Sequence, residues 1–157
     1  MRLTEEDQRI YQTTLAPYLA SPVVRQMASY TQHGAVSTLG HCLAVAKISL
    51  WLNRVLRLRA NTDTLLAGAL LHDFYLYDWH GSGWRHSYRH PEVARRNAVR
   101  YFHADDEVQH VIRCHMWPLG ITHTPHTREA ILVSVADKCA SLYETLFRRK
   151  DVRRSCG

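Results

Sequence analysis

The sequence predicts an all-α fold in which one bundle of helices forms a single domain. Apolar residues recur at the i, i+3, i+4 and i+7 spacing of a helix in several segments. Capping residues, prolines and glycines separate these segments. No segment shows the sustained alternation of apolar and polar residues that is typical of a half-buried strand. The 157 residues are enough to bury the core of one domain.

Four helices are predicted in the first half of the chain. The acidic turn TEED suits the start of the first helix, because negative side chains stabilise a helix N-terminus. Pro22 favours a helix start, since proline is tolerated at the first helical position. The NTD cluster at 61–63 supplies capping side chains for the fourth helix. The four helices are predicted to span residues 5–16, 22–31, 36–58 and 64–76.

Three more helices are predicted in the second half. Residues 78–90, DWHGSGWRHSYRH, contain two glycines and are predicted to form a loop before a helix that Pro91 begins and His90 caps. The sequence ADDE at 104–107 starts the next helix, and Pro118 to Pro125 mark a second loop. The first of these helices is predicted to span 91–103 and the last 127–149. The helix between them is predicted to start at about 104.

Composition and charge narrow the class of protein. Apolar residues make up 46% of the chain and charged residues 22%, which is typical of a globular domain. The last ten residues, RRKDVRRSCG, hold five basic residues and one Asp, and so carry +4 of the net charge of +6. We therefore predict one domain over 1–147 and a solvated basic tail over 148–157. The rest of the chain lacks the basic stripe expected of a nucleic-acid-binding protein.

Several features favour a cytoplasmic protein. No apolar run is long enough to span a membrane, and the acidic N-terminus, MRLTEEDQRI, is unlike an export signal. The four cysteines form no CxxC pair and no dense disulfide pattern, which suits a reducing compartment. Three of them, Cys42, Cys114 and Cys139, are interpreted as small core residues.

Six polar residues occupy apolar positions or helix starts. Each alone would be an ordinary hydrogen-bonded core residue, but together they place two carboxylates and four imidazoles in one core. Two buried carboxylates repel each other unless a proton or a cation lies between them. Imidazole nitrogen and carboxylate oxygen suit Mn, Fe, Co, Ni, Zn or Mg, so the set predicts a divalent metal site. The six residues are His41, His72, Asp73, His90, His115 and Asp137.

The order of these residues resembles the H…HD…D signature of the HD-domain metal-dependent phosphohydrolases. His41 stands in HCLAVA, the pair His72 and Asp73 follows LLAGALL, and Asp137 stands in VADK. The resemblance covers roughly residues 33–146. The segments HGAVSTLGH, LLHDFYLYDWH and CHMWPL are similar to a bacterial subgroup of HD proteins for which no substrate can be stated.

The resemblance implies an HD-domain-like helical bundle with a central metal site. His90 and His115 match the extended pattern of members that hold two metals. Asp73 would then bridge the two ions and be the catalytic carboxylate. The implied ligands are His41, His72, Asp73 and Asp137 for the first metal, and Asp73, His90 and His115 for the second.

The implied activity is hydrolysis of a phosphoester in a small phosphorylated substrate. Two metals about 3.5–4 Å apart can clamp a phosphoryl group and activate water. The alternatives are a diiron oxygenase of the same fold and a metal-stabilised nucleotide-binding module. The sequence specifies neither the substrate, nor the metal, nor the oligomeric state.

Three positions bear on substrate binding. Many HD hydrolases carry a lysine three residues after the HD aspartate, where this chain has Leu76. Lys138 follows Asp137 and is predicted either to neutralise a substrate phosphate or to form a salt bridge with a neighbouring helix. His33, near the start of the long helix, is predicted to contact substrate, with helix capping as the alternative.

Overall fold

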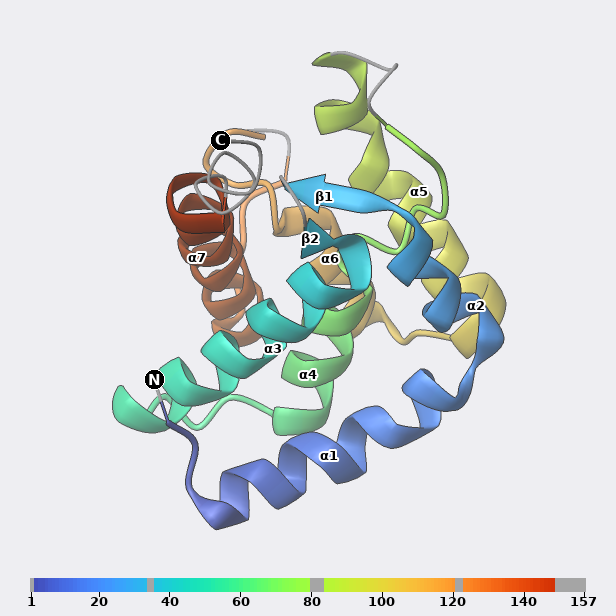
Figure 1. The fold of residues 1–157 in the computed structure, drawn as a ribbon. Helices are drawn as coiled ribbons and strands as arrows, with labels where there is room; N and C mark the ends of the chain where they lie inside the picture. The colour runs from blue at the N-terminus through green and yellow to red at the C-terminus, as the bar shows by residue number, and fades with distance from the viewer. Residues whose placement is uncertain (1, 34–35, 80–83, 121–122, 149–157) are drawn as a thin grey trace, which may run out of the picture.

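The structure is a computed structural model. It describes residues 2–33, 36–79, 84–120 and 123–148, without the side chains of residues 33, 84–87 and 148 (Figure 1). The helices are α1 (Glu5–Ala20), α2 (Pro22–Gln26), the 3-10 turn η1 (Met27–Ser29), α3 (Thr38–Val55), α4 (Thr62–Leu71), α5 (Trp84–Phe102), α6 (Asp106–Cys114), α7 (Arg128–Tyr143) and the π-helical turn η2 (Glu144–Arg148). The strands are β1 (Thr31–His33) and β2 (Val36–Ser37). The all-α prediction is confirmed, with one short hairpin added to it.

Helix α4 forms the centre of the bundle. Every residue from Thr64 to Leu71 is buried, because α3, α6 and α7 pack around this helix and α1 crosses beneath it (Figure 1). Asn61 caps its N-terminus by accepting hydrogen bonds from the backbone N–H groups of Asp63 and Thr64. The C-terminal end of α4 therefore delivers the residues that follow it into the interior.

Helices α4 and α6 approach each other closely at one glycine. A Cβ atom at Gly68 would lie 2.5 Å from Cγ1 of Val111, a distance that real Cβ contacts do not show. Glycine is therefore required at this position by the neighbouring helix and not by a turn. The close approach places the C-terminal end of α4 beside that of α6.

Two predicted helix boundaries were wrong because proline lies inside a helix. Helix α1 passes Pro17 and ends at Ala20, four residues beyond the predicted end. Helix α5 starts at Trp84, so Pro91 lies in its interior and does not begin it. His90 is accordingly a residue of the helix body and not its cap. An interior proline removes one backbone hydrogen bond, yet the rest of the helix can continue.

Other boundaries shifted by a few residues. The predicted helix over 64–76 ends at Leu71, because the chain tightens into a turn in which the Phe74 N–H donates to the Leu71 carbonyl over 3.1 Å. In place of the helix predicted over 22–31, the structure has α2 and the turn η1, which end at Ser29. The antiparallel hairpin β1–β2 follows them. The helix predicted over 127–149 is α7 followed by η2.

The prediction for the cysteines was right for two of three. Cys42 and Cys114 are buried core residues, but Cys139 is exposed on α7. Among the described residues, no helix combines the length and the apolar character needed to cross a membrane. The single-domain boundary remains a prediction, and residues 149–157 of the predicted basic tail lie outside the described residues.

Candidate metal centre

The structure brings together the six polar residues that the sequence singled out. They come from five helices or from the turns directly after them, and all six are buried. His41 lies in α3, the His72–Asp73 pair follows α4, His90 lies in α5, His115 follows α6, and Asp137 lies in α7.

His72 and His115 are positioned by the same local arrangement. Each is the C-cap of its helix, where the last carbonyl groups have no partner within the helix. His72 Nδ1 donates to the carbonyl of Ala69 over 2.8 Å, and His115 Nδ1 donates to the carbonyl of Ile112 over 2.7 Å. When each ring is neutral, as a metal ligand must be, these bonds place its proton on Nδ1, and its Nε2 then presents a lone pair to the centre of the cluster.

The Asp73 carboxylate faces two pairs of imidazoles with different oxygens. Its Oδ2 lies 3.4 Å from His72 Nε2 and 4.0 Å from His41 Nε2. Its Oδ1 lies 3.2 Å from His90 Nε2 and 3.7 Å from His115 Nε2. A carboxylate placed in this way can serve two ions at once, because each oxygen has its own lone pairs.

His41 is held from both sides by Asp137 and by Glu144, a residue that the sequence analysis did not identify. His41 Nε2 lies 3.1 Å from Asp137 Oδ1, and Nδ1 lies 2.9 Å from Glu144 Oε2. Glu144 is buried at the start of η2 and lies seven residues after Asp137, two helical turns further on the same face. That spacing was the signal that could have identified it.

The carboxylates of the cluster favour positive charge beside them. Burial lowers the pKa of His72, but the adjacent Asp73 carboxylate outweighs burial and holds that pKa well above its ordinary value. Burial raises the pKa of Asp73, and His72 and His90 more than reverse this, so the carboxylate stays ionised. Burial, with the charges of His72 and His90, lowers the pKa of His115 to about 3, which keeps its ring neutral.

Two buried atoms of the cluster make no hydrogen bond of acceptable geometry with any described residue. They are His72 Nε2 and Asp73 Oδ1. A buried polar atom without a partner is costly, and a bound cation on each side of Asp73 would satisfy both atoms. Donor atoms of His41, His72 and Asp73 lie within 4.8 Å of one another, and so do those of Asp73, His90 and His115. The donor set therefore fits two divalent ions that share Asp73.

A second polar network, missed by the sequence analysis, supports Asp73 from the hairpin. Gln32 in β1 is buried, and its Nε2 donates to Asp73 Oδ2 over 2.6 Å. The hydroxyl of Tyr75 donates to Gln32 Oε1, and Thr38 Oγ1 lies 3.2 Å from that hydroxyl. Strand β1 has only three residues, too few to show the alternation of apolar and polar residues that marks a strand. The sequence therefore did not indicate that the Gln32 side chain is buried.

The two predicted substrate residues, Lys138 and His33, and the position of the missing lysine, Leu76, differ in their surroundings. Lys138 Nζ lies 3.0 Å from Asp137 Oδ2 and also donates to the backbone carbonyl of His115 on the neighbouring helix. Leu76 has a left-handed backbone, with φ of 58°, and packs against the core. The His33 side chain lies outside the described residues, so its predicted role remains a prediction.

A cavity of about 410 Å³ opens onto the cluster. Four of the candidate donors, Asp73, His90, His115 and Asp137, line it. A small ligand can therefore reach the cluster from solvent.

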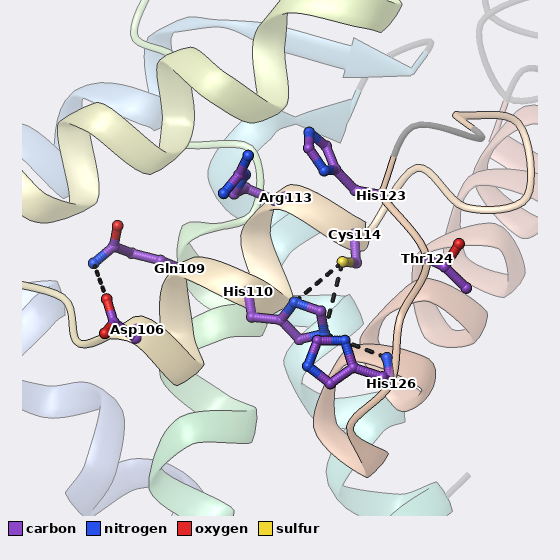
Figure 2. Close-up of a pocket in the computed structure, with 8 residues that line it drawn as sticks. All are labelled: Asp106, Gln109, His110, Arg113, Cys114, His123, Thr124 and His126. Atoms are coloured by element: carbon purple, nitrogen blue, oxygen red, sulfur yellow. Dashed lines mark hydrogen bonds between the residues drawn. The ribbon is translucent and has the colours of Figure 1, made fainter.

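A second cavity, of about 450 Å³, shares no described lining residue with the first (Figure 2). Its main feature is the tilted ring pair His110 and His126, with ring centroids 3.8 Å apart. His110 is half-buried, its Nε2 accepts from the His126 N–H, and its Nδ1 lies 3.5 Å from Cys114 Sγ. Both ring nitrogens are thus engaged, and this cavity does not repeat the donor arrangement of the cluster.

The comparisons with known proteins agree with the geometry. Residues 38–142 match the family described as HD domain, which includes all six residues of the cluster. No curated protein and no solved structure matches the chain. The family match covers well over half of the chain, so this protein belongs to the HD domain family, within the superfamily of metal-dependent phosphohydrolases.

Proposed function

We propose that this protein is a phosphohydrolase that uses two divalent metal ions to cleave a phosphoester in a small phosphorylated substrate. The first ion is held by His41, His72, Asp73 and Asp137, and the second by Asp73, His90 and His115. The observation that carries the proposal is the orientation of Asp73, whose two oxygens face separate pairs of imidazoles.

Bound divalent ions supply Lewis acidity, which activates water and neutralises the charge of a phosphoryl group. The chain provides the arrangement that this chemistry needs. The Ala69 and Ile112 carbonyls fix the His72 and His115 rings, and Gln32 holds one oxygen of Asp73. In the overall reaction, water adds its oxygen to phosphorus, the phosphorus–oxygen ester bond breaks, and the leaving oxygen takes a proton to become an alcohol.

The test is the substitution Asp73→Asn in the full chain. An amide has nearly the same shape but offers one neutral oxygen in place of a bridging carboxylate. We expect the wild-type protein, loaded with Mn²⁺, to hydrolyse phosphoesters in a way that a chelator abolishes. The variant should lose this activity by several orders of magnitude, with its helical content unchanged by circular dichroism. Retention of more than about a tenth of the activity, equivalent to about 1.4 kcal/mol, contradicts the proposal.

Two controls make the result specific. Lys138→Ala removes a charge beside Asp137 without removing a candidate ligand, and should reduce activity less than Asp73→Asn. Elemental analysis of the purified wild type should give two metal ions per chain. Iron in that analysis together with substrate-dependent O₂ uptake, and no phosphoester hydrolysis with any divalent ion, would replace the proposal with oxygenase chemistry.

A further inference from the structure

The cavity that opens onto the six-residue cluster is lined by apolar side chains as well as by candidate metal ligands. The apolar residues are Trp79, Met116, Leu119 and Leu142. They come from the segments that follow α4 and α6 and from the C-terminal part of α7. A cavity of about 410 Å³ is within the range of small-molecule sites, which are commonly apolar with a few polar groups that orient the ligand.

Two of these wall residues are unusually exposed for their type. Leu119 is 70% exposed and Leu142 is 62% exposed, and both stand at the cavity. Large apolar side chains gathered at one opening are typical of a surface that an apolar ligand covers. The Trp79 ring is held in place, because its Nε1 donates to the backbone carbonyl of Thr31 over 3.1 Å.

The charge of the lining argues for one anionic group in the ligand. Lys138 is the one lysine or arginine among the described residues that line the cavity. It already contacts the Asp137 carboxylate and the His115 carbonyl. The two candidate ions can neutralise one phosphoryl group, but no further cationic side chain in the described lining is placed to neutralise a second. The remaining polar residues, Gln32, Ser141 and Thr145, are uncharged hydrogen-bonding groups.

We propose that the substrate is a phosphomonoester with an uncharged, largely apolar organic group of about the size of an aromatic ring, and not a polyphosphate. The phosphoryl group lies at the cluster, and the organic group lies against Leu119, Leu142 and Trp79. This inference rests on the proposed function, because it takes the cluster as the place where the phosphoryl group binds.

The test separates ligand preference from turnover by using phosphonates, which cannot be hydrolysed. Calorimetry on the Mn²⁺-loaded full chain compares 2-phenylethylphosphonate with 3-phosphonopropionate, which share the phosphonate and a two-carbon spacer. The first ends in an apolar ring and the second in a carboxylate. We expect the phenyl compound to bind at least tenfold more tightly. Equal affinities, or tighter binding of the carboxylate compound, overturn the inference.

Two matched variants locate the preference in the cavity. Leu142→Ser removes apolar surface from the wall and should reduce the affinity ratio about tenfold. Leu146→Ser makes the same change at a residue that is also about half exposed but does not line the cavity, and should leave the ratio unchanged. A ratio that responds equally to both variants contradicts the assigned wall.

Turnover then tests the proposed function by itself. Metal-dependent hydrolysis of both 2-phenylethyl phosphate and glycerol 1-phosphate, without a preference in phosphonate binding, supports the proposed function and overturns the substrate class. A clear binding preference without hydrolysis of any phosphoester supports the cavity assignment and contradicts the proposed function.

Discussion

Gly68→Ala tests the close packing of α4 against α6. The added methyl group would lie 2.5 Å from Cγ1 and 2.8 Å from Cβ of Val111. Valine has little rotational freedom at its first side-chain torsion, so the helices must separate to relieve the contact. Overpacking of a core costs about 1–3 kcal/mol, and this contact belongs at the upper end. Alanine recovers about 1 kcal/mol through its helix propensity, which leaves a net loss of about 2 kcal/mol in the free energy of unfolding.

Thermal unfolding followed by circular dichroism measures this loss. For a chain of this length about 1 kcal/mol corresponds to roughly 2–4 °C, so Tm should fall by about 4–8 °C. Gly40→Ala is the matched control, because its added methyl group meets only the side chains of Ser37 and Val36, at 3.3 and 3.6 Å, and its Tm should fall less than that of Gly68→Ala. Adding Val111→Ala to Gly68→Ala should restore at least about 1 kcal/mol beyond additivity. A Gly68→Ala protein as stable as the wild type would refute the packing.

Three shorter predictions concern the cluster and the end of the bundle. Glu144→Gln should weaken metal binding about 10–100-fold in a titration with Co²⁺, because the hydrogen bond to His41 loses its charge; unchanged affinity would show that this bond does not support the ligand. His90→Ala should halve the metal content by elemental analysis, whereas a structural role alone would lower only the stability. The Asp7 carboxylate, whose pKa burial raises but Thr4 and Arg54 lower overall, stabilises the fold above the unfolded pKa of about 3.8 and stops doing so as pH falls through its lower folded value. Asp7→Asn should therefore reduce Tm at pH 7, and this difference should vanish at strongly acidic pH.

The helical fold and the clustering of polar residues could be predicted because both follow from periodicity. A histidine or aspartate at an apolar helix position must enter the core wherever that face is buried, as His41 and Asp137 do. No single one of these residues indicated a shared site. The number of polar residues at apolar positions indicated it. The assignment of individual ligands to individual ions remains a prediction.

Features that depend on tertiary contacts could not be predicted. Gln32 enters the core because a short hairpin folds over Asp73, and its sequence neighbours carry no strand pattern. Pro91 looks the same in the sequence whether it begins a helix or lies within one, so the start of α5 at Trp84 was not visible. Glu144 stands among exposed residues at the end of α7, so its spacing of two helical turns from Asp137 was the one sequence signal for its burial against His41.

The distribution of the donors along the chain determines when the centre can form. His41 and Asp137 are 96 positions apart, and His41 and Glu144 are 103 positions apart. Protein synthesis at about 5–20 residues per second separates the first of these donors from the last by roughly 5–20 s. During that interval the emerging chain carries an incomplete set of the candidate ligands, without the fixed geometry of the folded site. The complete set is therefore brought together only after α7 has left the ribosome, by the finished fold.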